Sequence, residues 1–136
     1  NIAFSYRKET SNLILVSSRN HQELRLQNLI KKMNFSETKK IGSVGCKVAS
    51  ILRGESDVYI SLSGKTSPKD WDMAAPQAII EAAGGDFTHA DERPLNYQTS
   101  DYSQSGCLIA SHGKSHQEIC KKAMRIFSKL EPDYKV

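Results

Sequence analysis

Short apolar runs alternate along this chain with longer segments in which apolar residues recur three or four positions apart. The runs predict buried strands at 13–16, 39–44, 57–62, 86–88 and 107–110. The helical spacing predicts helices at 23–33, 46–53, 71–83 and 115–130. Gly54 and Gly84 directly follow two of these helices, as glycine commonly does where a helix ends.

This alternation is typical of an α/β domain. We predict a mostly parallel or mixed sheet of about five strands flanked by helices, in one domain that covers residues 1–136. The polar, turn-rich segment 91–105 is expected to be a surface loop. Ligands of such sheets bind beyond the carboxyl ends of the strands. That edge would carry three polar segments, namely SSRNH at 17–21, GSVGCK at 42–47 and the loop 63–69 with the DWD that follows it.

Composition and charge narrow the function classes. Hydrophobic residues make up 38% of the chain and charged residues 25%, which fits a soluble globular domain. The net charge of +4 suits an anionic small molecule, and because no run of Lys and Arg concentrates it we expect no nucleic-acid partner. No apolar run approaches the ~20 residues of a membrane span, so we expect no membrane partner. Cys46, Cys107 and Cys120 show no metal-ligand spacing, and we expect reduced thiols on core elements of a cytoplasmic protein.

An acidic cluster, Asp70-Trp71-Asp72, opens the alanine-rich helix. From the residues alone, Asp72 is either a first-turn carboxylate favoured by the helix dipole or a ligand that holds Mg²⁺ against a phosphate. We predict that Asp70 caps the helix and that Trp71 packs to anchor the turn, which leaves Asp72 for another task. Mg²⁺ usually takes only one or two protein carboxylates, so Asp72 would be part of a site and not the whole of it.

The other two polar segments offer contacts for an anion. In GSVGCK the glycines let the backbone approach a ligand, Ser43 can donate a hydrogen bond and Lys47 supplies a charge for phosphate, although a plain tight turn fits as well. In SSRNH, Arg19 can bind phosphate through two hydrogen bonds and His21 can stack on a base, although an exposed polar loop is the alternative. Lys65 either helps to neutralise phosphate or is simply solvated.

Three stretches together resemble one protein family. WDMAAPQAIIEAAGG at 71–85 resembles the C-terminal signature of the inositol monophosphatase superfamily. GSVGCKVASILRGESDVYISL at 42–62 and LVSSRNHQE at 15–23 are similar to segments of its 3'(2'),5'-bisphosphate nucleotidases. The resemblance implies the C-terminal domain of a Mg²⁺-dependent phosphatase that hydrolyses the 3'-phosphate of 3'-phosphoadenosine 5'-phosphate to AMP in sulfur metabolism. It also implies Asp72 as a metal ligand, with substrate-binding residues Ser18, Arg19, His21, Ser43, Lys47 and Lys65.

The chain departs from this family pattern in two places. Many of the nucleotidases carry an Arg where this chain has Ser61. The upstream glutamate and the D-P-[IL]-D-G-[ST] motif, which supply the other metal ligands, are absent, and Glu55, Asp57, Asp86, Asp91 and Glu92 do not form it. We therefore expect the C-terminal half of an enzyme, inactive alone, in which Asp72 reaches across a domain cleft.

The expected partners are a phosphorylated nucleotide and a missing N-terminal domain of the same protein, with a homo-oligomer as a further option. Alternative substrates within the superfamily are an inositol phosphate, a sugar bisphosphate or NADP. A different class of function, a non-catalytic phosphonucleotide- or partner-binding domain, also fits the residues.

Overall fold

A five-stranded sheet forms the centre of the molecule. The computed structural model describes residues 2–18, 24–62, 70–97 and 106–136. The strands are β1 (Ile14–Ser18), β2 (Glu37–Ile41), β3 (Val58–Leu62), β4 (Asp86–His89) and β5 (Cys107–Ser111). The helices are α1 (Leu24–Met33), α2 (Val44–Leu52), α3 (Asp70–Ala82) and α4 (His116–Leu130), with a short 3₁₀ turn, η1 (Thr10–Asn12), before β1. Every strand and helix predicted from the sequence is confirmed, with ends that shift by a few residues.

The sheet is mixed, in the order β2-β1-β3-β5-β4. β1 pairs in parallel with both β2 and β3, whereas β5 pairs antiparallel with both β3 and β4. Helices connect β1 to β2 and β2 to β3, as parallel neighbours require. β5 follows β4 without an intervening helix among the described residues, and it runs back between β3 and β4.

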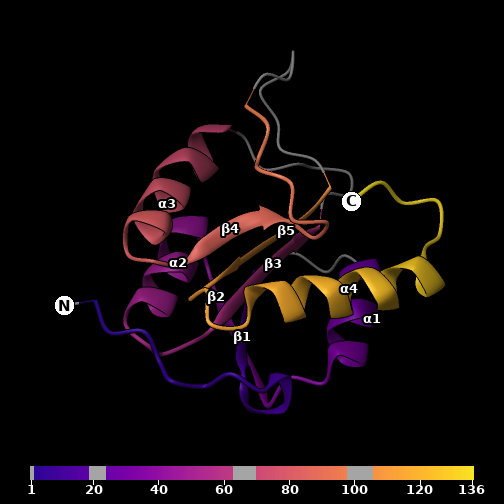
Figure 1. Ribbon diagram of the computed structural model, residues 1–136, viewed down its shortest axis with the longest axis horizontal. Coiled ribbons are helices and arrows are strands. Elements are labelled where there is room, and N and C mark those ends of the chain that lie inside the picture. Colours follow the sequence, from indigo (N-terminus) through magenta and orange to yellow (C-terminus); the bar gives the residue numbers. More distant parts are fainter. Residues whose placement is uncertain (1, 19–23, 63–69, 98–105) are drawn as a thin grey trace.

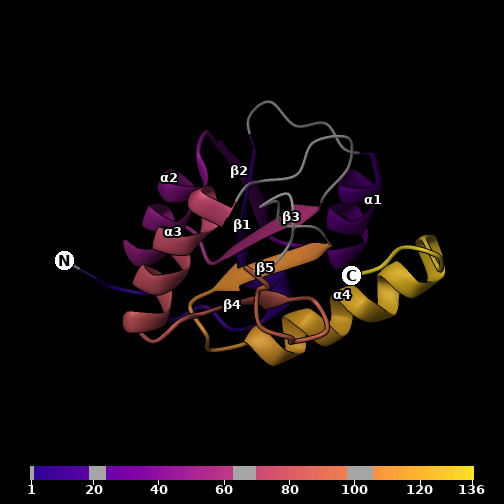
Figure 2. The same cartoon turned by 90° about the horizontal axis from the view of Figure 1, so that it is seen from above.

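Helices cover both faces of the sheet. α1 and α4 pack side by side on one face, and α2 and α3 pack on the other (Figures 1 and 2). Successive strand residues point to opposite faces of the sheet. Leu15 and Ile60 therefore pack in the core beneath α1 and α4, whereas their neighbours Val16 and Tyr59 pack in the core beneath α2 and α3. Because both faces are covered, the central strands are apolar on both sides, which explains why they appear in the sequence as unbroken apolar runs.

Four local expectations are corrected by the structure. Ser17 and Ser18 belong to strand β1 and not to a loop. The segment after β4 starts as part of the packed domain, since Leu95 is buried. Cys46 is exposed, because the helix that carries it turns that side to solvent, whereas Cys107 and Cys120 are buried. Asp70 is already a helical residue, so the capping position falls before it, outside the described residues.

The Gly84–Gly85 pair shapes the turn from α3 into β4. Gly84 has a φ of +100°, a conformation that favours glycine. A Cβ on Gly85 would lie 2.5 Å from the Ser111 carbonyl oxygen, so the turn can pack against the end of β5 only without a side chain there. This turn fixes where β4 begins, and α3 precedes it directly.

Candidate functional site

The carboxyl ends of β1, β2 and β3 lie at one edge of the sheet because these three strands are parallel. Ser18, at the end of β1, is half-buried and aligns with Ile41, the last residue of β2. The GSVGCK turn follows Ile41 directly, and α3 begins after β3. The structure therefore brings Ser18, the GSVGCK turn and the start of α3 to one edge. Arg19, His21 and Lys65 lie outside the described residues, so their placement stays a prediction.

Ser43 caps α2 in this structure. Its side chain is exposed, and its hydroxyl accepts a hydrogen bond from the backbone N–H of Cys46 at 3.2 Å. Its carbonyl oxygen accepts another from the N–H of Lys47 at 3.1 Å. Capping satisfies backbone donors at the helix start, which helps to explain why a helix begins here.

Lys47 is buried at the same turn, with only 3% of its surface exposed. Its ammonium donates hydrogen bonds to the carbonyl oxygens of Gly42 and, at 3.4 Å, of Ile41. It also lies 5.2 Å from the centre of the Tyr59 ring, within the range of a cation–π contact. Burial lowers the pKa of Lys47. The ammonium would have to exchange these carbonyls for a phosphate in order to contact one.

Tyr59 connects this turn with Asp72. Its side chain is buried, and its ring meets Phe87 edge-on at 6.2 Å. Burial raises the pKa of Tyr59 to about 12, with a hydrogen bond to Ser61 acting against this and the charge of Asp72 adding to it. The phenol therefore stays protonated at neutral pH. Asp72 itself is exposed on the first turn of α3, so its carboxylate is accessible at the edge where β3 ends.

A complete metal centre is not assembled by the described residues. Among them, no group of three or more His, Cys, Asp or Glu side chains lies close enough together to hold a metal ion. Asp72 supplies one exposed carboxylate, which fits one position of a Mg²⁺ site. The role of Asp72 as a metal ligand therefore stays a prediction, and the described residues do not complete a site around it.

A Ser-His pair elsewhere in the fold is structural. Ser111 Oγ lies 2.8 Å from His116 Nδ1, and Thr88 Oγ1 lies 2.9 Å from His116 Nε2. Ser111 has no exposed surface, so no substrate reaches its hydroxyl. Burial lowers the pKa of His116, which keeps the imidazole neutral between its two hydroxyl partners. The pair ties α4 to β4 and β5.

The opposite edge of the sheet holds a polar cluster that the sequence analysis missed. Asp57 lies there with no exposed surface and contacts Arg7 and Ser5, which are distant in sequence. An open surface hollow of about 700 Å³ lies next to Arg7, with Ile14 and Ser36 also in its lining. The one available signal was an acid placed directly before a buried strand, and this does not reveal partners about fifty positions away.

Comparison with known proteins assigns the chain to a family. Residues 2–127 match the inositol monophosphatase family. The chain belongs to this family. A solved structure, the inositol monophosphatase of Thermotoga maritima, superimposes with a TM-score of 0.73 at 20% identity, covering 96% of this chain and 47% of that one. The inositol monophosphatase fold is therefore confirmed for the domain, while an identity this low shows the fold alone.

Three curated proteins that are similar to this chain have names that state an enzyme activity. Rat 3'(2'),5'-bisphosphate nucleotidase 1 is 28% identical over 71% of this chain and 32% of its own length. Mouse Golgi-resident adenosine 3',5'-bisphosphate 3'-phosphatase is 30% identical over 87% of this chain and 33% of its own length. Xenopus laevis inositol monophosphatase 3 is 32% identical over 87% of this chain and 34% of its own length. The chain thus spans about a third of the curated relatives that it matches.

Proposed function

We propose that this chain is the C-terminal part of a Mg²⁺-dependent phosphomonoesterase that converts 3'-phosphoadenosine 5'-phosphate to AMP. The observation that carries the proposal is the exposed Asp72 carboxylate at the start of α3, at the same sheet edge as Ser18 and the GSVGCK turn. The names of the rat and mouse relatives support the bisphosphate substrate. A role in cytoplasmic sulfur metabolism belongs to the same proposal. The mouse relative's name places that protein in the Golgi, and no described helix has the length and apolar character needed to span a membrane.

Each residue at this edge has a proposed task. Asp72 would hold Mg²⁺, which when bound activates a water and stabilises charge on the phosphate. Ser18, Ser43, Lys47 and, outside the described residues, Arg19, His21 and Lys65 would bind the nucleotide and its phosphates. Tyr59 stays neutral and supports Lys47 through its ring. Ser61 stands where many nucleotidases carry an Arg, and it has no positive charge. The negative charge of the phosphates would therefore be balanced by Lys47, Lys65 and Arg19.

The remaining ligands would come from the part of the family fold that this chain does not span. We propose that this part packs on the outer face of α3. That face is apolar and exposed, and it consists of Ala74, Ala75, Ala78, Ile79 and Ala82. Ile79 has 52% of its surface exposed. The face begins two residues after Asp72, so a domain seated on it would lie next to the carboxylate.

The isolated chain is therefore expected to self-associate through this face. Replacing Ile79 with Lys should shift its average mass in light scattering toward that of the monomer, because exposed apolar area favours association and a charge opposes it. Gln117→Lys, which adds the same charge on the exposed side of α4, is the matched control and should leave the mass unchanged. A wild-type chain that stays strictly monomeric at high concentration would count against a missing partner on α3.

The activity test is phosphate release from 3'-phosphoadenosine 5'-phosphate with Mg²⁺. We expect no release by this chain alone and release by the longer protein, since one carboxylate cannot assemble the metal site. Robust release by this chain alone, lost in Asp72→Asn, would show that one domain builds a complete site and would overturn the account of missing ligands. No release by either protein would overturn the nucleotidase assignment.

Substrate comparison in the longer protein separates the alternatives. The Xenopus relative's name favours an inositol phosphate as the second candidate substrate. Faster hydrolysis of inositol monophosphate than of the bisphosphate nucleotide would establish that reading, and the same assay extends to a sugar bisphosphate and NADP. Nucleotide binding by this chain with no turnover in any longer form would instead favour a non-catalytic binding domain.

A further inference from the structure

Residues 2–9 form a segment without helix or strand, here called the strap, which runs below the sheet in Figure 1. None of its side chains is fully buried, and Tyr6 is 90% exposed. Only Phe4 packs in part against an apolar core. The strap is therefore held mainly by polar contacts and not by apolar burial.

Two groups of those contacts lie at the end of α2 and at the start of α4. At the carboxyl end of α2, the N–H of Ala3 donates to the carbonyl of Leu52 at 2.8 Å and the Arg7 guanidinium donates to the carbonyl of Gly54 at 2.8 Å. At the start of α4, the Ser115 hydroxyl donates to the carbonyl of Lys8 at 2.7 Å. Gly54 has no side chain to obstruct this approach, since a Cβ there would lie 2.5 Å from the Ala3 carbonyl oxygen.

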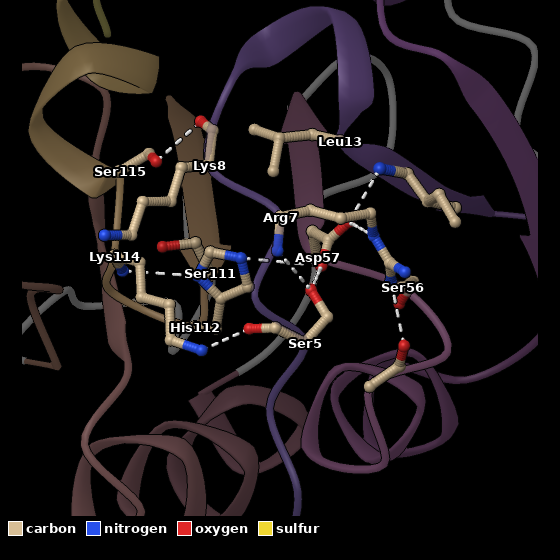
Figure 3. Close-up of polar contacts among 12 residues, drawn as sticks. Ser5, Arg7, Lys8, Leu13, Ser56, Asp57, Ser111, His112, Lys114 and Ser115 are labelled. Carbon is tan, nitrogen blue, oxygen red and sulfur yellow. Dashed lines mark hydrogen bonds and ion pairs between the residues drawn. The ribbon is translucent and has the colours of Figure 1, made fainter.

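Asp57, directly before β3, is the centre of the arrangement (Figure 3). Arg7 Nε lies 2.6 Å from its Oδ2 atom, the Ser5 hydroxyl donates to its Oδ1 atom, and the N–H of Ile14 donates to Oδ2 at 2.8 Å. Burial works to raise the pKa of Asp57, but the contacts from His112, Arg7, Ser5 and Ile14 outweigh it and hold the pKa well below its usual range. The carboxylate is thus charged at neutral pH, and Arg7 is the one permanently charged strap residue bonded to it.

His112 lies on the other side of this carboxylate. Its Nδ1 atom accepts a hydrogen bond from the N–H of Lys114 at 3.2 Å, which leaves the hydrogen of a neutral ring on Nε2. Nε2 lies 3.4 Å from Asp57 Oδ1 but is not aligned as a hydrogen bond. Because Ile14 and His112 belong to the body of the domain, Asp57 keeps the Ile14 hydrogen bond and stays near His112 when the strap leaves.

The strap is open on its other side. An open surface hollow of about 700 Å³ lies between it and the start of β1, with Arg7, Lys8, Ile14 and Ser36 in its lining. The strap is therefore held by separate polar contacts and by Phe4, and it has open space beside it.

We propose that the strap is a latch that opens as a unit while the sheet stays folded, and that the Arg7–Asp57 ion pair is its main fastening. Opening would uncover Asp57 and His112 and would release the carboxyl end of α2. The ion pair is suited to this task because one partner is rigid and fully buried, whereas 32% of the Arg7 side chain is exposed and can return to water. Local opening of this kind needs few buried apolar contacts in the moving segment, which describes the strap.

The test is hydrogen exchange on the full 136-residue chain at pH 7, with limited trypsin cleavage after Lys8 as a second measurement. Arg7→Met is expected to raise strap exchange and cleavage by about tenfold or more, because charge-assisted hydrogen bonds are lost. Peptides from β3 and β5 should keep wild-type exchange. Arg93→Met, which removes a surface ion pair with Asp91, is the matched control and should change neither measurement.

Three results would overturn the proposal. If strap exchange in Arg7→Met equals that of the wild type, the ion pair does not fasten the strap. If β3 and β5 lose protection together with the strap, the segment is an inseparable part of the fold and not a latch. Arg7→Met takes the counter-charge from the buried Asp57, which keeps the hydrogen bond from the Ile14 N–H and lies near His112, so a melting curve of the variant accompanies the exchange data. A strap that opens while the melting temperature changes little supports the latch, and a fall in melting temperature without selective strap exchange overturns it.

Discussion

Replacing Asp72 with asparagine in the complete phosphatase is expected to lower turnover by about a hundredfold or more, with little change in thermal stability. Loss of a residue that merely supports a metal ligand lowers metal affinity or activity by about 10–100-fold. Loss of a ligand itself should lower activity by at least as much. The fold is expected to lose little, because Asp72 is exposed on the first turn of α3. The measurement is steady-state hydrolysis of 3'-phosphoadenosine 5'-phosphate at saturating Mg²⁺, beside a melting curve.

Glu81→Gln is the matched control for this variant. Glu81 is an exposed carboxylate on the same helix, hydrogen-bonded to Gln77 on the surface. It should keep wild-type turnover and stability. Near-normal turnover of Asp72→Asn would remove Asp72 from the metal site, and a loss of activity that merely follows a lowered melting temperature would assign it a structural role.

Replacing Asp57 with asparagine should have the largest effect on stability. The change replaces a buried charged acceptor of hydrogen bonds from Ser5, Arg7 and Ile14 with a neutral amide, so we expect a loss of about 3 kcal/mol in the free energy of unfolding. For a chain of this size that corresponds to a fall in melting temperature of about 10 °C. Asp91→Asn, at an ion pair on the surface, is the control and should cost well under 1 kcal/mol. Equal melting temperatures for the two variants would show that the polar cluster around Asp57 does not contribute to the stability of the fold.

The same carboxylate sets a pH dependence. Because the pKa of Asp57 is lower in the folded chain than in the unfolded chain, its charge stabilises the fold above the unfolded pKa of about 4. That contribution is lost as the pH falls from about 4 through the lower folded pKa. Denaturant unfolding of the wild type and Asp57→Asn should therefore differ most near neutral pH and converge in acid. A difference that stays constant down to pH 2 would exclude the charge of Asp57 as its cause.

The elements of the fold could be predicted because they depend on local pattern. Apolar runs such as 57–62 and 107–110 needed no partner to be recognised as strands, and Gly54 and Gly84 marked helix ends. The direction of β5 was harder to predict, because it depends on where the strand inserts in the sheet. The edge that carries Ser18, the GSVGCK turn and Asp72 followed from the rule that ligands bind at carboxyl ends of parallel strands.

The sequence by itself determined the order of strands and helices and the family, because each of these rests on neighbours or on spacing along the chain. Only the tertiary structure decided that Lys47 is buried against the carbonyls of its own turn and the Tyr59 ring. It alone also paired Asp57 with Arg7, since contacts between residues fifty positions apart depend on how the sheet brings its edges together.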